Sequence, residues 1–280
     1  MTKQDQTRGR DGARLSAARQ QLILSLIGRG DIISVGDLAI RFGVSQETIR
    51  RDIRALEKAG GLRRVHGGAA PTGAVDLTAR RPVTERLGVE REAKAIAAEA
   101  ALPLFDAGMT VFLGGSSTML LLAEALAQRG PALSVTTNMI DIATVLAGCG
   151  HCKVTLLGGV MKASTRTLVG PDTLRMLEHR LFDLAVCGTS AIGAMHGFLG
   201  PSEWHAAIGA TLAERARLLA FVADASKFGR GDAYVVQPLH KVDALATDHV
   251  PESEMVASLN DAGVRLLLPQ PEGARRAASS

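Results

Sequence analysis

Residues Ser45–Arg54 read Ser-Gln-Glu-Thr-Ile-Arg-Arg-Asp-Ile-Arg. At helical periodicity, Ile49, Ile53 and Leu56 fall on one stripe, because they recur at spacings of four and three residues. The side chains that point away from this stripe are Gln46, Thr48, Arg50, Arg51 and Arg54. The pattern predicts an amphipathic helix with one face in a core and a basic face free to meet a polyanion.

The segment before this helix completes a helix-turn-helix pattern. Val35–Phe42 is a second apolar-periodic stretch, and Gly43-Val44 separates it from Ser45. The Ser45 hydroxyl can accept a hydrogen bond from a free backbone N–H at the start of the next helix. A helix, a short glycine-containing turn and a second helix with a basic face form the arrangement whose second helix lies in a DNA major groove.

The flanking segments predict a winged helix over residues 14–70. Apolar residues at helical spacing between Leu15 and Ile27 predict a helix ahead of the pair. Gly60-Gly61 ends the recognition helix, and Leu62–Ala69 reads as a strand and turn that carries two arginines. A basic hairpin in this position is the wing, placed to touch the DNA backbone or minor groove.

The arginines suit either DNA contact or an ordinary solvated helix face. Their place in a helix-turn-helix with a basic wing favours DNA contact. The predicted DNA-binding residues are Ser45, Gln46, Thr48, Arg50, Arg51, Arg54, Arg63, Arg64 and His66. For Arg51 and Arg54 the choice stays open between phosphate contacts and ion pairs with Asp52 and Glu57.

Charge separates the two parts of the chain. Its 280 residues allow two domains, and 46% apolar residues are enough for a sizeable core. Residues 1–70 hold thirteen Lys/Arg and seven Asp/Glu, whereas residues 71–280 hold nineteen and twenty-one. A basic first domain and a near-neutral second one are typical of a nucleic-acid reader with a separate sensing body.

The sequence features that bear on cellular location all predict a cytoplasmic protein. Residues 1–18 contain no apolar run, so we expect no secretory signal. The sequence contains no run of eighteen apolar residues, so no membrane span is expected. Cys149, Cys152 and Cys187 are an odd set, which favours reduced thiols in a cytoplasm over a disulfide framework.

The second part of the chain reads as an α/β domain. Residues 71–84, rich in Pro, Gly and Thr, are interpreted as a linker, and residues 85–270 as the sensing domain. Apolar strands without polar alternation are separated by helices, which predicts a Rossmann-like parallel sheet covered on both faces. The expected strands are Thr110–Leu113, Leu133–Thr137, Val154–Leu157, Leu184–Cys187, Leu218–Ala223, Ala244–Thr247 and Val264–Leu268. The expected helices are Glu85–Ala101, Met119–Ala127, Ile140–Ala147, Ala206–Arg215 and Glu252–Asn260.

Polar and glycine-rich loops follow several of these strands, where ligands of parallel sheets bind. The loop Gly114–Thr118 follows a strand and opens a helix, so its N–H groups and hydroxyls can hold an anion. Taken alone, such a loop is also ordinary turn chemistry. Thr137-Asn138, Gly158-Gly159 and Gly188-Thr189-Ser190 could complete a pocket. The spacing of Lys227 fits a surface lysine and a phosphate-binding residue equally well.

The amino-terminal motifs resemble those of the DeoR (deoxyribose-operon repressor) family of bacterial transcriptional regulators. They are Ser45–Ile53, Leu56-Glu57 and Val65-His66-Gly67-Gly68-Ala69. This resemblance implies a repressor of a carbon-utilisation operon that binds double-stranded operator DNA. It also implies release by a phosphorylated sugar, polyol or related metabolite.

Six segments of the second domain resemble the sensor domain of the same family, whose fold is related to ribose-5-phosphate isomerase. They are Gly115–Thr118, Thr136-Thr137-Asn138, Leu157-Gly158-Gly159, Leu168-Val169-Gly170-Pro171, Cys187-Gly188-Thr189-Ser190 and Asp224–Gly229. The effector-site residues that this resemblance implies are Gly115, Ser116, Ser117, Thr118, Asn138, Gly158, Thr189 and Lys227. The chain departs from the family pattern at two places. The family more often has an acidic residue followed by Ala-Gly-Thr-Thr at Gly114–Thr118, and a lysine at Gly209.

Three other functions compete with this interpretation. Catalysis on an isomerase-like fold is disfavoured, because Asp183, Glu203 and Asp224 are not accompanied by a tight acid and lysine cluster. A redox or metal switch at Cys149-Gly150-His151-Cys152 would need further ligands from Cys187 or a distant histidine, so incidental thiols are favoured. A nucleic-acid-coating protein is disfavoured by the aromatic content of 3%. We therefore expect a homo-oligomeric regulator, a dimer or tetramer, without enzymatic activity, cofactor or metal.

Overall fold

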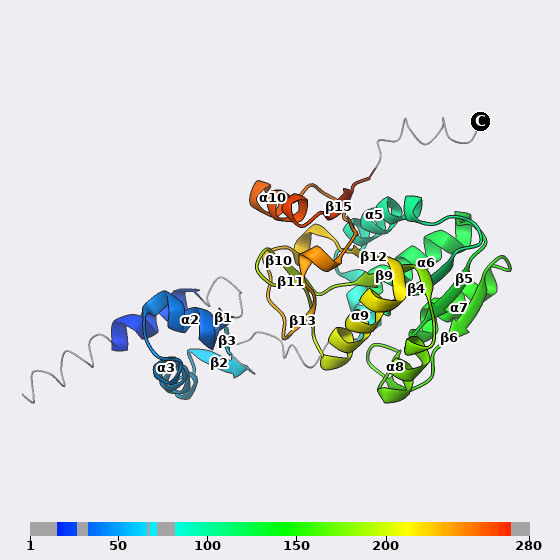
Figure 1. Cartoon of the computed structure of the whole chain (residues 1–280). Coiled ribbons are helices and arrows are strands. Elements are labelled where there is room, and N and C mark those ends of the chain that lie inside the picture. Colours follow the sequence, from blue (N-terminus) through cyan, green and yellow to red (C-terminus); the bar gives the residue numbers. More distant parts are fainter. Residues whose placement is uncertain (1–15, 27–32, 66–67, 72–81, 270–280) are drawn as a thin grey trace, which may run out of the picture. The chain divides into compact units, whose positions relative to one another are not determined.

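The computed structural model describes residues 16–26, 33–65, 68–71 and 82–269. The chain divides into two compact units, Met1–Leu77 and Thr78–Ser280, whose elements can be followed by their labels in Figure 1. No described helix combines the length and the apolar character that crossing a lipid bilayer requires.

The first unit is a winged helix-turn-helix. A helix over residues 16–26 precedes α2 (Val35–Phe42) and α3 (Gln46–Lys58). The strands β1 (Ile33–Ser34), β2 (Leu62–Val65) and β3 (Gly68–Pro71) form an antiparallel sheet in the order β1-β3-β2. The predicted stripe of Ile49, Ile53 and Leu56 is buried in the core of this unit, together with Ile23 and Leu38.

A buried carboxylate joins the first helix to α3. Asp52 accepts hydrogen bonds from Arg19 Nε at 2.5 Å, from Gln20 Nε2 at 2.9 Å and from Ser16 Oγ at 3.0 Å. Burial by itself raises the pKa of Asp52, but these bonds and the charge of Arg19 outweigh it, so the pKa lies below its usual value. The suggested pairing of Asp52 with Arg51 or Arg54 was wrong, because Asp52 lies on the buried side of α3.

The second unit is built on a seven-stranded parallel sheet in the order β15-β14-β12-β9-β4-β5-β6. Its strands are β4 (Thr110–Leu113), β5 (Ser134–Thr137), β6 (Lys153–Leu156), β9 (Phe182–Gly188), β12 (Ala216–Val222), β14 (Ala244–Ala246) and β15 (Arg265–Leu267). This confirms the predicted parallel sheet.

Successive residues of the central strands bury on opposite faces of the sheet. Val111 and Leu113 pack with α5 (Arg91–Ala101), α6 (Ser117–Arg129) and α7 (Ile140–Gly148). Phe112 packs with the cluster that holds α8 (Pro171–Glu178), α9 (Glu203–Arg215) and α10 (Ser253–Asp261). Because both faces are covered, the strands carry apolar residues without polar alternation.

The prediction of one helix over Glu85–Ala101 was wrong, because this segment forms two helices. They are α4 (Val83–Gly88) and α5, separated by Glu90 in a left-handed conformation with φ 49°. The Nζ of Lys94 donates to the carbonyls of Arg86, at 2.6 Å, and of Val89. A buried lysine therefore caps the end of α4, and this interaction supports the break.

Several short elements were absent from the sequence analysis. Besides α8, these are the hairpin β7 (Val160–Lys162) and β8 (Thr167–Val169), and a three-stranded antiparallel sheet of β10 (Ala191–Gly193), β11 (Gly197–Gly200) and β13 (Tyr234–Gln237).

The strand order changes direction between β4 and β9. From β4 the chain adds β5 and β6 on one side, and β9, β12, β14 and β15 then extend the other side. Ligands of open parallel sheets bind at such a switch point, beyond the carboxyl ends of the strands. The fold therefore directs attention to the loops after β4 and β9.

Candidate functional site

The exposed face of α3 is basic. Ser45 is its N-cap, and the Ser45 hydroxyl accepts a hydrogen bond from the Thr48 N–H at 3.2 Å, as the sequence predicted. The side chains of Gln46, Arg50, Arg51 and Arg54 are exposed, as is Ser45, and Thr48 is half-buried. One side of the helix therefore holds the core while the other presents amide, hydroxyl and guanidinium groups.

The ion pairs on this face are weak. Glu47 lies 3.7 Å from Arg50 and 3.7 Å from Arg54, and all three side chains are more than half exposed. Exposed pairs of this kind contribute about 0–1 kcal/mol and are screened by salt. They do not prevent the arginines from turning to DNA phosphates or bases.

The wing is the pair of strands β2 and β3, anchored to the core by Leu62 and Ala69. Arg63 and Arg64 lie in β2, opposite Ala70 and Ala69 of β3. The predicted contact His66 lies outside the described residues. The β2–β3 hairpin follows α3 directly, which is where a wing is expected.

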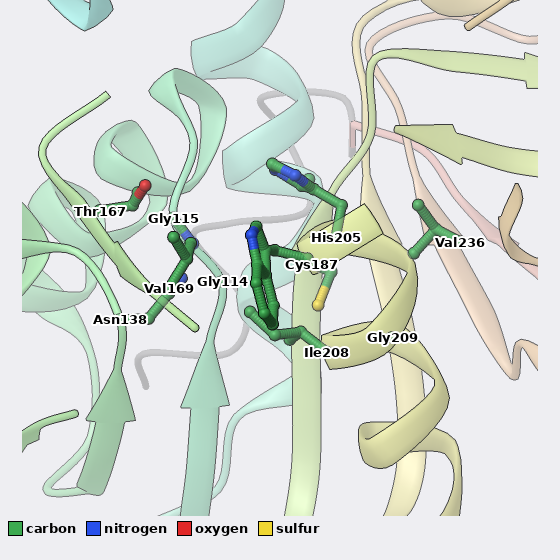
Figure 2. Close-up of a pocket in the computed structure, with 12 residues that line it drawn as sticks. Gly114, Gly115, Asn138, Thr167, Val169, Cys187, His205, Ile208, Gly209 and Val236 are labelled. Carbon is green, nitrogen blue, oxygen red and sulfur yellow. The ribbon is translucent and has the colours of Figure 1, made fainter. Parts of the chain in front are cut away.

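The second unit contains a pocket at the switch point. Its cavity has a volume of about 40 Å³, within an open depression of about 460 Å³ that includes solvent space. The loops after β4 and β5 and the last residues of β9 contribute to it, and β8, α9 and β13 supply the rest (Figure 2). The lining residues are Gly114, Gly115, Asn138, Thr167, Val169, Cys187, Gly188, Trp204, His205, Ile208, Gly209 and Val236.

Asn138 fixes the polar side of this pocket. Its buried side chain accepts a hydrogen bond from the Gly115 N–H at 2.9 Å and donates to the Leu168 carbonyl at 3.1 Å. A Cβ on Gly115 would lie 2.4 Å from Thr167 Cγ2. Only glycine at residue 115 therefore allows the loop to pack this closely against β8. The Gly114–Ser116 loop is therefore held in place before any ligand arrives.

The opposite side is largely apolar. Ile208 and Val236 line it, and burial raises the pKa of the Cys187 thiol to about 12, so this group is neutral. His205 is the one imidazole among the lining residues, and its Nδ1 lies 2.9 Å from Ser202 Oγ. The pocket thus suits a ligand with few charges on the part that enters it.

Gly209 explains a departure from the family pattern. A Cβ on Gly209 would lie 2.6 Å from Val236 Cγ1 and 3.0 Å from the Val236 carbonyl oxygen. A lysine at residue 209 therefore does not fit unless Val236 and its strand move. In this chain Val236 lines the pocket beside Gly209, which makes this side less charged.

The predicted effector residues do not all meet at the pocket. Gly115 and Asn138 line it. Ser116 does not line it but contacts the lining residue Gly188, since a Cβ built on Gly188 would lie 2.3 Å from Ser116 Oγ. Ser117 and Thr118 are buried in the first turn of α6.

Two further predicted residues are engaged in local bonds. The Gly158 carbonyl accepts from Thr173 Oγ1 at 2.7 Å. Thr189 Oγ1 lies 2.8 Å from the Ala191 carbonyl and 2.7 Å from the Leu199 carbonyl.

Lys227 belongs to an ionic cluster beyond the end of β12. Its Nζ lies 3.0 Å from Oδ2 of the buried Asp224. Burial raises the pKa of Asp224, but the Ser226 hydroxyl and the charges of Lys227 and Lys94 outweigh it, so the pKa lies below its usual value. Burial lowers the pKa of Lys94, and the charge of Lys227 lowers it further. The sequence analysis missed Lys94, whose one signal was a lysine inside an alanine-rich helix.

Comparison with protein families matches both units. Residues 19–72 match the DeoR-like helix-turn-helix domain, and residues 89–249 match the DeoR C-terminal sensor domain. The HTH-type transcriptional regulator GlpR of Haloferax volcanii is 32% identical over 255 residues, which cover 90% of this chain and 98% of that protein. The glycerol-3-phosphate regulon repressor of Escherichia coli K12 is 28% identical over 251 residues, covering 89% and 98%.

Solved structures give a more distant likeness. Ribose 5-phosphate isomerase A from Neisseria gonorrhoeae aligns with a TM-score of 0.37 and 17% identity, covering 51% of this chain and 55% of that one.

Proposed function

Because this chain belongs to the DeoR family of helix-turn-helix transcriptional regulators, we propose that it represses a carbohydrate or polyol utilisation operon. A phosphorylated sugar or a related metabolite releases it from its operator. It acts in the cytoplasm, beside its DNA target. Its relatives are named as regulators or repressors, and the chain is accordingly a regulator and not an enzyme.

One observation carries this proposal. A single chain holds an exposed basic helix in one compact unit and a pocket at the switch point of a parallel sheet in the other. The first is suited to duplex DNA and the second to a small molecule. In a dimer or tetramer, paired recognition helices would read half-sites about one or more helical turns apart.

Contacts of α3 with DNA would combine phosphate and base recognition. The exposed arginines supply charge, so affinity should fall as salt rises. Gln46 and Arg50 lie at the start of α3, which is the part of a recognition helix that meets base edges. Each such base contact is worth about 1–3 kcal/mol of discrimination.

The phosphate of the effector would bind beside the pocket. The amino end of α6 carries partial positive charge, and Ser116 offers a hydroxyl there. Lys94 and Lys227 together with Asp224 leave one net positive charge beyond the end of β12, the strand next to β9. The uncharged remainder of the ligand would then lie against Asn138 and the apolar side.

The test is a screen of sugar phosphates and polyol phosphates with two readouts, thermal unfolding of the protein and anisotropy of labelled operator DNA. A ligand at 100 times its dissociation constant adds about 2.7 kcal/mol of stability. The same compound should weaken operator binding roughly 5- to 150-fold. If no phosphorylated sugar or polyol does both, the proposed effector class is wrong.

A matched pair of variants locates the site. Gly188→Ala places a methyl group against Ser116 and should abolish the response to the effector while leaving operator binding intact. Gly193→Ala is the control, because its Cβ would meet nothing within 4 Å. If Gly188→Ala still responds to the effector as the parent does, the effector does not bind at this loop.

A further inference from the structure

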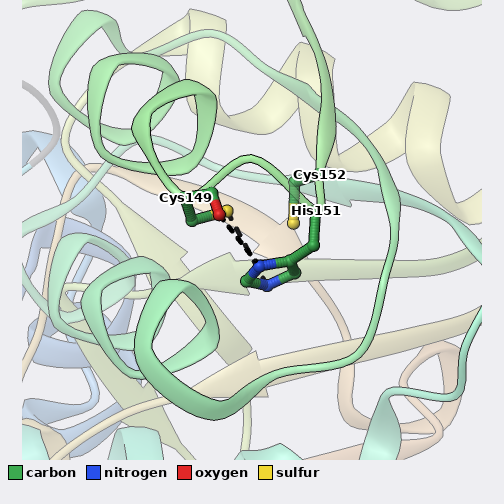
Figure 3. A group of neighbouring side chains, drawn as sticks. All are labelled: Cys149, His151 and Cys152. Atoms are coloured by element: carbon green, nitrogen blue, oxygen red, sulfur yellow. Dashed lines mark hydrogen bonds between the residues drawn. The ribbon is translucent and has the colours of Figure 1, made fainter.

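A loop at the other end of the sheet brings three metal-ligating side chains together. Cys149, His151 and Cys152 lie between α7 and β6, and their thiol and imidazole ligand atoms are all within 4.8 Å of one another (Figure 3). Gly150 adopts φ 77°, the left-handed turn that brings its neighbours to one side. The sequence suggested two thiols and too few ligands, whereas the structure adds His151 from the same loop.

We propose that this loop binds Zn²⁺ through Cys149, His151 and Cys152. The distance from Cys149 Sγ to His151 Nε2 is 3.7 Å. Zn–S bonds of about 2.3 Å and Zn–N bonds of about 2.0–2.1 Å at tetrahedral angles place these atoms roughly 3.6 Å apart. The observed separation therefore needs little change to accept the ion.

The imidazole lies between two carbonyl oxygens. His151 Nδ1 is 3.2 Å from the Cys149 carbonyl oxygen and Nε2 is 3.3 Å from the Leu126 carbonyl oxygen, so either ring nitrogen can be the donor in the metal-free loop. A ligating histidine commonly donates its second ring N–H to a carbonyl, which fixes the tautomer. Zinc would select the tautomer in which Nδ1 donates to Cys149 and the lone pair of Nε2 binds the ion.

The surroundings favour a cation over bare thiolates. The Leu126 carbonyl, near the end of α6, lies 3.3 Å from His151 Nε2, and the Leu146 carbonyl, near the end of α7, lies 3.0 Å from Cys149 Sγ. Two helix carboxyl ends thus add partial negative charge at the loop. This charge opposes an unpaired thiolate and stabilises a bound divalent ion.

The ligand count defines the type of site. Cys187 cannot join, because it is buried at the pocket at the opposite end of the strands. Three protein ligands leave the fourth position of a tetrahedral zinc ion open to water or to a further donor. Since both thiols must be deprotonated, binding of one Zn²⁺ releases up to two protons.

The experiment uses the full chain, kept reduced with a phosphine and stripped of metal. Co²⁺ should give a sulfur-to-cobalt charge-transfer absorption that saturates at one ion per chain. Zn²⁺ should displace the cobalt and, in competition with a chromophoric chelator, yield the same stoichiometry. Neither measurement involves DNA or an effector, so failure here leaves the proposed function untouched, and the converse also holds.

Variants separate this loop from chance binding. Cys149→Ser, His151→Ala and Cys152→Ser should each weaken Zn²⁺ binding at least about tenfold, since even outer-shell changes cost 10–100-fold. Cys187→Ser and His196→Ala, which remove a thiol and an exposed imidazole elsewhere, should bind as the parent does. The proposal is overturned if the reduced parent gives no cobalt–thiolate absorption or if the three loop variants bind unchanged. It is equally overturned if the loop only forms a Cys149–Cys152 disulfide on exposure to peroxide and takes up no metal.

Discussion

The helices α3 and α6 begin in the same way and serve opposite purposes. Each has 13 residues, and each follows a serine whose hydroxyl accepts the N–H three residues later at 3.2 Å. In α3 a narrow apolar stripe and Asp52 are buried and most other side chains are exposed, whereas α6 is buried along most of its length. Local sequence rules start both helices, and the pattern of burial decides what each can do. The first offers a side-chain surface, and the second offers only its amino end.

This difference has an energetic side. The free energy that holds α3 in place comes from a few apolar residues and from the buried Asp52 cluster. The helix α6 contributes to a much larger core that also includes α5, α7 and the sheet. The first unit should therefore be the one that single substitutions unfold more easily.

The largest expected effect comes from Asp52→Ala. It leaves Arg19 without its carboxylate in a partly buried position, and breaking a buried pair costs about 3–5 kcal/mol. Urea unfolding should show the first unit destabilised by this amount and the second unit unchanged. Because the pKa of Asp52 is lowered, its contribution is complete above the usual pKa of 3.8 and is lost as the pH falls below that value.

Asp141→Ala is the matched control for this substitution. Asp141 also accepts from an arginine, Arg166, but their side chains are 25% and 44% exposed. The cost should stay within about 1 kcal/mol. Equal losses from the two aspartates would mean that the Asp52 cluster does not hold the first helix against α3.

The next largest effect should come from replacing Arg50 and Arg51 together by alanine. Both side chains are exposed, so stability should hardly change while operator affinity falls. One base contact and one phosphate contact amount to about 2 kcal/mol or more, which is roughly a 30-fold loss of affinity. Anisotropy measures the loss, and the exposed pair Arg175 and Arg217 provides a control with the same change of charge. If both double variants lose the same operator affinity, α3 contributes only through the net charge of the protein and not through specific contacts.

The smallest effect compares the two caps directly. Ser45→Ala and Ser116→Ala each remove one helix-capping hydrogen bond, worth about 1 kcal/mol. Each loss should appear only in the unfolding of its own unit, measured by denaturant titration. A loss that appears in both units after a single substitution would show that they do not unfold independently.

The sequence was sufficient where one periodicity dominated. The stripe of Ile49, Ile53 and Leu56 predicted α3, and continuous apolar runs predicted the seven parallel strands. It was insufficient for the sheet of β10, β11 and β13, because β10 ends in Gly193 and β11 begins and ends with Gly197 and Gly200, and glycine at these places reads as a turn. The break at Glu90 was also hidden, since a non-glycine residue rarely adopts a positive φ.

The pocket was predictable on one side only. Gly115 and Asn138 follow neighbouring parallel strands, so their meeting follows from the order of the sheet. His205 and Ile208 reach the same pocket from α9, whose position over the strand ends is set by packing. No local signal in the sequence announced this approach, and Lys94 was hidden in the same way.

Lys94 connects the cap of α4 to the ionic cluster of Asp224 and Lys227. The helix α4 is the first described element of the second unit, and one ammonium group ties its end to α5 while it also feels the charges of Asp224 and Lys227. An anion that drew this ammonium group away would free the end of α4 from α5. The lysine would then act as an ionic latch between the two helices, and opening it would require no rearrangement of the large sheet.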